Sequence, residues 1–135
     1  MRPRGIYPAI LTFATVFQAG EGPKDAHNGV IRSVSELRKT LRGVRGLAGE
    51  LVDNVNFGKE QLIFVALGRC DSGHEAQITS VTYVTDRGGL PPLTEVSYKE
   101  ITPMLPAFEQ DVEATYPMHV IRLKRLDGET TFNKN

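Results

Sequence analysis

The sequence is poor in cysteine and tryptophan and carries no net charge. It has one cysteine and no tryptophan in 135 residues, and its 16 basic side chains balance 16 acidic ones. One cysteine excludes an intramolecular disulfide, so we expect a cytoplasmic protein rather than an exported one. A neutral chain generates no overall field that attracts nucleic acid, and no apolar run is long enough to span a bilayer. We therefore expect neither nucleic acid nor a membrane among its partners.

The first twenty residues admit two interpretations. Arg2 and Arg4 precede a mildly apolar stretch at 6–17, an order that also occurs in secretory leaders. Polar residues, including Tyr7, Thr12 and Thr15, dilute this stretch where a leader needs to be most apolar. We therefore favour a single first β-strand in this region over a leader.

The chain has the size of one domain and contains no internal repeat or linker, so we predict a single domain over residues 1–135. One helix is expected in the N-terminal half, at 34–41. Ser33 and Glu36 have the spacing of a capping box, in which each side chain accepts a hydrogen bond from the backbone amide of the other residue. A second helical turn at 44–52 is disfavoured by Gly46 and Gly49.

Several β-strands follow the predicted helix. A continuous apolar run at 62–67 is typical of a central strand buried on both faces. The strand at 75–85 changes its apolar parity, which predicts a bulge near Thr79 and Ser80. If these two strands form a hairpin, Cys70 lies near its tip. We expect an edge strand at 93–102, and a strand at 118–125 that turns back through 126–129 into a short strand at 130–132.

The predicted elements indicate an α+β fold that is mainly antiparallel β. One helix followed by a run of short strands disfavours alternating parallel βαβ units. We expect the antiparallel strands to form a sandwich or an open barrel, with the single N-terminal-half helix covering one side.

Cys70 and His74 are the first candidates for chemistry, because a thiol beside an imidazole can form a nucleophile and base pair. Asp71 or Glu75 would have to orient the imidazole, and no residue marks an oxyanion hole. A cysteine at the tip of a hairpin is also hard to shield from water. We therefore expect no enzyme, and keep a Cys70–His74 hydrolase as a minor alternative.

Metal and phosphate sites are not predicted either. The cysteine and the three histidines lack the paired spacing of zinc motifs; they are His27, Cys70, His74 and His119. Gly68 and Gly73 have the spacing of a P-loop, but no Lys-Ser or Lys-Thr follows them. We therefore expect no metal and no cofactor.

Two segments concentrate charge of opposite sign. Basic residues gather around the predicted helix: Arg32, Arg38, Lys39, Arg42 and Arg45. Acidic residues gather later in the chain: Glu109, Asp111 and Glu113. Such segments are usually solvated faces, and on one neutral chain they would also suit head-to-tail self-association.

The order of four segments resembles that of one family, the PrcB-like protease-complex-stabilising proteins, over residues 8–132. The segments are Ser33-Val34-Ser35-Glu36-Leu37, Val55-Asn56-Phe57-Gly58-Lys59-Glu60 before the apolar strand, Ser72-Gly73-His74-Glu75 before the next strand, and Tyr116-Pro117-Met118-His119. Where the family usually has Thr-Gly-Gly-Tyr, this chain has Ser72-Gly73-His74. The resemblance implies a small β-rich domain that has no enzymatic activity and that binds and stabilises another protein.

We therefore predict a non-catalytic protein-binding domain that stabilises or modulates a partner, either another protein or a second copy of the chain. The loop that departs from the family pattern supplies the partner-binding candidates: Arg69, Cys70, Asp71, Ser72 and His74. The alternative is a small-molecule or nucleotide-binding module that uses the 68–75 loop.

Overall fold

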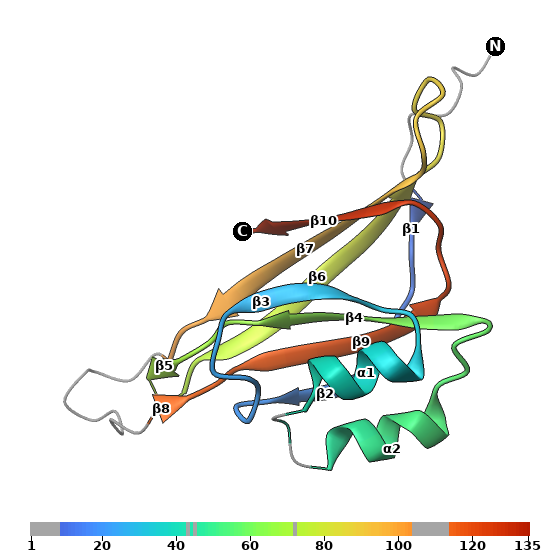
Figure 1. Cartoon of the computed structure of the whole chain (residues 1–135). Helices are drawn as coiled ribbons and strands as arrows, with labels where there is room; N and C mark the ends of the chain where they lie inside the picture. Colours follow the sequence, from blue (N-terminus) through green and yellow to red (C-terminus); the bar gives the residue numbers. More distant parts are fainter. Residues whose placement is uncertain (1–8, 43, 45, 72, 104–113) are drawn as a thin grey trace.

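The computed structural model describes residues 9–42, 44, 46–71, 73–103 and 114–135. It contains ten strands and two helices within these residues (Figure 1). In chain order they are β1 (Ala9–Ile10), β2 (Ala14–Ala19), β3 (His27–Ile31), α1 (Val34–Thr40), α2 (Leu47–Asn54), β4 (Glu60–Ala66), β5 (Cys70–Asp71), β6 (Glu75–Val84), β7 (Leu93–Ile101), β8 (Ala114–Thr115), β9 (Met118–Lys124) and β10 (Glu129–Lys134).

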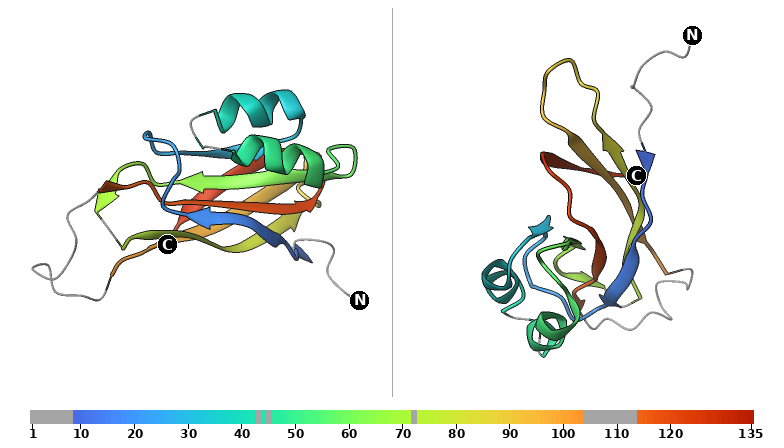
Figure 2. Two further views of the ribbon diagram at one scale, coloured as in Figure 1. Left: turned by 90° about the horizontal axis from the view of Figure 1, so that it is seen from below. Right: turned by 90° about the vertical axis from the view of Figure 1, so that its right-hand side faces the viewer.

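The elements form three layers, which Figure 2 shows from two further sides. The middle layer is a four-stranded sheet in the order β2-β9-β4-β3, called here the central sheet. A second four-stranded sheet, β1-β6-β7-β10, packs on one face of it and is called the outer sheet. The two helices cover the other face. The expected α+β fold, mainly antiparallel β, is confirmed.

Strand β4 is buried on both faces, as its continuous apolar sequence predicts. Leu62 and Phe64 pack in the cluster that includes the helices, whereas Ile63 and Val65 pack in the cluster that includes the outer sheet. Neighbouring residues of one strand therefore belong to two different apolar clusters. This arrangement explains why the segment has no polar alternation.

The helical layer contains two helices rather than the single one expected. Helix α1 begins after Ser33, whose hydroxyl accepts a hydrogen bond from the Glu36 amide at 3.1 Å. The reciprocal bond differs from the capping box, because the Glu36 carboxylate accepts from the Arg32 amide at 3.3 Å. Helix α2 forms because Gly46 is its N-cap, with φ of 75°, rather than an interior residue. Gly49 is exposed, and so its missing side chain leaves no gap in the core.

The N-terminal segment forms two strands rather than one. Strand β1 pairs with β6 in the outer sheet, and β2 pairs with β9 in the central sheet. Residues 11–13 pass from one sheet to the other, and the Leu11 amide donates to the Val81 carbonyl at 2.9 Å. Within the part of the chain that the structure describes, no helix is long and apolar enough to cross a membrane.

The hairpin predicted through 126–129 is wrong, and β4 and β6 do not form the hairpin considered for them, because the chain changes sheet at both places. Strand β4 pairs with β3 and β9, whereas β6 pairs with β1 and β7, so residues 67–74 connect the two sheets. After β9 the chain also crosses to the outer sheet, where β10 pairs with β7 in parallel. Strand β7 therefore lies inside its sheet and is not an edge strand.

The predicted bulge in β6 is confirmed. The register of β6 against β7 shifts between Ile78 and Ser80. Before the shift Ala76 and Ile78 are buried, and after it Val81 is buried. Because of the extra residue, even-numbered apolar side chains face the central sheet before the bulge and odd-numbered ones face it afterwards.

His119 joins the two sheets inside the core. It lies on β9, is 3% exposed, and its Nδ1 accepts a hydrogen bond from the Ile78 amide of β6 at 2.8 Å. Since Nδ1 is an acceptor, the neutral ring carries its proton on Nε2 and donates it to the Thr15 hydroxyl at 2.8 Å. Burial lowers the pKa of His119.

Gly128 allows the crossover from β9 to β10. Its φ is 89°, and a Cβ at this position would collide with the carbonyl group of Pro92. The adjacent Glu129 amide donates to that carbonyl at 3.1 Å, and the Arg32 guanidinium donates to the Leu126 carbonyl at 3.1 Å. The close approach positions β10 beside β7.

We expect Gly128→Ala to destabilise the fold more than Gly89→Ala, measured by urea unfolding. Gly89 also has a positive φ, of 91°, but nothing lies within 4 Å of its Cβ position. Gly89→Ala should therefore cost about 1 kcal/mol for the left-handed backbone alone. Gly128→Ala should cost at least about 1 kcal/mol more, because the Pro92 backbone must move. Equal effects of the two substitutions would contradict this crossover.

We also expect the free energy of unfolding to fall more steeply on acidification in the wild type than in His119→Asn. The native pKa of His119 lies below the ordinary value of 6.5, so the unfolded chain binds this proton first. The stability is therefore present above about pH 6.5 and is lost as the pH falls below it. Asn keeps an acceptor for the Ile78 amide but does not titrate. Parallel pH profiles for the two proteins, from denaturant unfolding at pH 7.5 to 5, would refute this expectation.

Candidate functional site

The 68–75 loop lies at one end of the sandwich, where the chain passes from the central to the outer sheet (Figure 1). The first half of the loop, from Gly68 to Asp71, is held by close backbone approach and strand pairing. Gly68 has φ of 75°, and a Cβ there would lie 2.9 Å from the Ala26 nitrogen. The following strand, β5, pairs with β8 in a two-stranded ribbon. The sequence of this loop therefore combines a glycine that permits a tight approach with residues that pair as a strand.

The predicted site residues differ in their exposure. Arg69 and Asp71 are exposed, whereas Cys70 and His74 are half-buried. Ser72 lies outside the described residues, as does the acidic stretch at 109–113. Successive side chains of a strand point to opposite faces. Cys70 therefore points inward, while its neighbours Arg69 and Asp71 face solvent.

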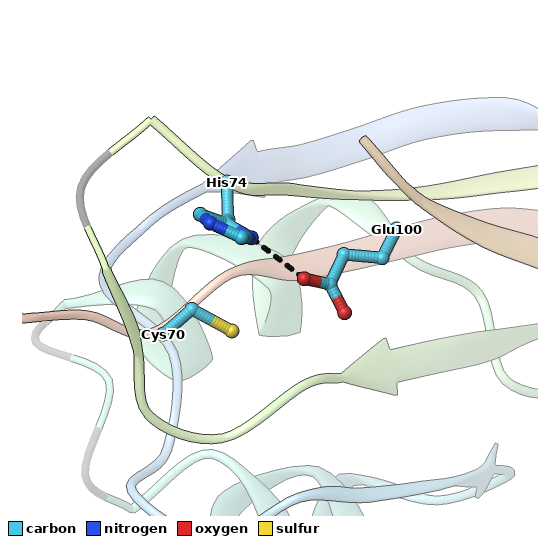
Figure 3. Close-up of side chains that lie close together, drawn as sticks. All are labelled: Cys70, His74 and Glu100. Atoms are coloured by element: carbon cyan, nitrogen blue, oxygen red, sulfur yellow. Dashed lines mark hydrogen bonds and ion pairs between the residues drawn. The ribbon is translucent and has the colours of Figure 1, made fainter. Parts of the chain in front are cut away.

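Cys70 and His74 lie close together, and the structure adds Glu100 to them. One ligating atom from each of the three side chains lies within 4.8 Å of the others, and the side chains point toward one another (Figure 3). His74 Nδ1 donates to Glu100 Oε2 at 2.6 Å. The other oxygen, Oε1, accepts from Lys134 Nζ at 3.3 Å. We call Cys70, His74 and Glu100 the Cys-His-Glu cluster.

Sequence reasoning missed Glu100 because it lies 26 residues after His74. The carboxylates considered as partners of the imidazole, Asp71 and Glu75, are exposed, and neither forms the observed bond. The β6–β7 register supplies the missing link, since Ala76 pairs with Glu100. Glu100 is therefore the diagonal neighbour of His74 on one face of the sheet. Only the correct register, bulge included, would have found it.

Charges in the cluster oppose a thiolate. The hydrogen bond from His74 lowers the pKa of Glu100, with a further contribution from Lys134, so the carboxylate is ionised. Burial, and then the charge of Glu100, raise the pKa of Cys70. The sulfur is therefore a protonated thiol at neutral pH. Among the described residues, the thiol forms no hydrogen bond with the His74 imidazole.

The remaining histidines lie away from the cluster. His27, on β3, packs edge-on against Phe64 with ring centroids 5.0 Å apart. His119 is buried between the sheets. A cavity of about 240 Å³ adjoins the cluster, and His74, Gln18 and Thr115 are among the residues that line it.

The described basic residues near α1 do not form one continuous surface. Arg32 is half-buried and links β4 to the β9–β10 connection, donating to Gln61 Oε1 at 3.3 Å and to the carbonyl of Leu126. Arg38, Lys39 and Arg42 instead line a shallow hollow on α1. Arg45 lies outside the described residues. The hollow is a basic surface on the helical layer, and α1 lies apart from β5, the strand that carries Cys70 (Figure 1).

Fold and site together define a small β-sandwich domain with two covering helices and a Cys-His-Glu cluster where the chain crosses between the sheets. Comparison with protein-family models, curated proteins and solved structures finds no match. The resemblance to PrcB-like proteins therefore stays a prediction.

We expect the Cys70 thiol to react slowly with iodoacetamide in the native protein at pH 7.5, because only the thiolate is nucleophilic. Glu100→Gln removes a charge that raises the pKa of Cys70, so alkylation should become severalfold faster. Glu75→Gln, an exposed carboxylate in the same loop, should leave the rate unchanged. Mass spectrometry follows the rate. A wild-type Cys70 as reactive as free cysteine would instead favour the hydrolase alternative.

Proposed function

We propose that this chain is a non-catalytic protein-binding domain that stabilises or modulates a partner through the 68–75 loop. The supporting observation is that charged side chains are exposed on and beside a paired strand of this loop. Arg69 and Asp71 face solvent while the backbone around them pairs with β8. A segment whose backbone is already paired loses little conformational entropy when it binds, and this favours affinity.

The electrostatics of the cluster also favour binding over catalysis. A nucleophilic cysteine needs a base that takes its proton, and here the imidazole instead bonds to Glu100. The thiol keeps its proton because burial and Glu100 raise its pKa. The resemblance to PrcB-like proteins supports the same class of function, with another protein or a second copy as the partner.

The small-molecule alternative needs a ligand pocket, and the cavity beside the 68–75 loop is small for one. At about 240 Å³ it falls below the range of about 300–1,000 Å³ typical of ligand pockets. A nucleotide also needs a basic or amide-lined phosphate site, and Glu75 is an acidic member of the lining. We therefore favour the protein-binding function over this alternative.

The proposal predicts that the partner is lost when the exposed charges of the loop are removed. The full chain is immobilised, a protein retained from native lysate is identified and purified, and its affinity is measured by calorimetry. The double variant Arg69→Ala with Asp71→Ala should bind at least about tenfold more weakly, a loss of about 1.4 kcal/mol. The partner should also melt at a higher temperature in the wild-type complex, because the domain binds its folded state.

The matched control is Arg38→Ala with Asp53→Ala, which removes the same two charges from exposed positions on the helices. It should bind within about twofold of the wild type. Light scattering of the chain alone tests the second copy as partner. Equal affinity of the loop variant and the control, or a monomer that retains no partner, would contradict the proposal.

A further inference from the structure

We propose that Cys70, His74 and Glu100 form a binding site for one zinc ion. The three side chains come from different parts of the fold: Cys70 from β5, His74 from the loop position just before β6, and Glu100 from the end of β7. They converge although no sequence spacing brings them together. Figure 3 shows the side chains pointing toward one another. The inference rests on this geometry and is independent of the proposed protein-binding function.

The distances suit a tetrahedral ion after small side-chain movements. Zinc binds sulfur at about 2.3 Å and nitrogen or oxygen at about 2.0–2.2 Å, which places ligand atoms about 3.3–3.7 Å apart. The ligating atoms of the cluster lie within 4.8 Å of one another. The widest pair therefore needs to close by no more than about 1.5 Å. The His74–Glu100 pair, at 2.6 Å, needs to open by less than about 1 Å.

The donor set selects the class of metal. One thiolate, one imidazole and one carboxylate are the ligands that zinc uses in proteins. Magnesium and calcium prefer sites built from oxygen atoms alone. Three protein ligands leave one tetrahedral position, which a water molecule fills.

The charges around the cluster are compatible with a cation. The carboxylate of Glu100 already attracts the Lys134 ammonium at 3.3 Å, and the Lys134 side chain is 51% exposed, so water can solvate the ammonium when an ion replaces it. Burial and Glu100 disfavour a thiolate at Cys70 when no cation offsets its charge. A divalent ion supplies that charge. On binding, the S–H bond of Cys70 breaks, the sulfur keeps the electron pair for the new Zn–S bond, and the proton goes to water. The Nδ1–H bond of His74 breaks as well. Its proton is transferred through water to Nε2, and the freed electron pair on Nδ1 forms the Zn–N bond.

A bound ion would join the loop to the outer sheet. It would tie β5 to β6 and β7, at the same end of the sandwich as the β5–β8 ribbon. The site is half-buried, with side-chain exposures of 20% at His74 and 25% at Glu100, so an ion reaches it from solvent. Zinc binding should therefore raise the free energy of unfolding of the domain.

The test uses the purified full chain, reduced with a phosphine, and zinc chloride as the probe. After gel filtration the wild type should retain about one zinc per chain, and saturating zinc should raise the melting temperature by at least about 5 °C. Cobalt chloride should give visible ligand-field bands and a near-ultraviolet sulfur-to-metal charge-transfer band. That band reports thiolate ligation in the wild type, whatever the stability of any variant.

Each of Cys70→Ser, His74→Asn and Glu100→Gln should weaken zinc binding at least about tenfold, with the fold checked by circular dichroism. The matched controls, His27→Asn and Glu75→Gln, remove one imidazole and one carboxylate from outside the cluster and should bind as the wild type does. Magnesium should give no thermal shift. Zinc retention below about a tenth of an ion per chain, unchanged binding in Cys70→Ser, or cobalt binding without the charge-transfer band would each overturn the proposal.

Discussion

The hydrogen bond between the buried His119 imidazole and the Ile78 amide fixes how the two sheets face each other. A buried amide without an acceptor is costly, so β6 keeps one position relative to β9. The bulge follows directly after Ile78, and the first half of β6 leads back to His74. The Cys-His-Glu cluster therefore depends on an interaction in the core, because the register that brings Glu100 beside His74 begins at this contact.

The connections between the sheets carry the functional candidates of this fold. The chain crosses between the sheets at 11–13, at 67–74 and at 125–128, and also between β7 and β9. The first three of these crossings are tied by backbone hydrogen bonds or by a glycine in the left-handed region. Only the second crossing places a thiol and an imidazole together. A crossing must leave one sheet and enter the other at a fixed position. Its side chains are therefore more constrained than those of an ordinary surface loop.

The sequence was sufficient for features that depend on near neighbours. The Ser33 cap, the burial of 62–67 on both faces and the bulge at Thr79–Ser80 each follow from a few adjacent residues. Sheet assignment was not predictable, because a turn signal such as that at 126–129 does not say which sheet receives the next strand. The parallel pairing of β10 with β7 and the position of Glu100 both depend on that choice. Gly46 shows the same limit, since a glycine counted against a helix became its N-cap.

The bulge in β6 acts as a parity switch between the two halves of one strand. Before it the even-numbered residues face the central sheet, and after it the odd-numbered ones do. The number of residues between Ile78 and Val81 therefore decides which side chains of each half face the core. A chain one residue shorter at Thr79 would retain the strand and the hydrophobic content of both halves. It would turn either Val81 or His74 to the opposite face of the sheet. In the first case the core would lose an apolar side chain, and in the second the Cys-His-Glu cluster would lose its imidazole.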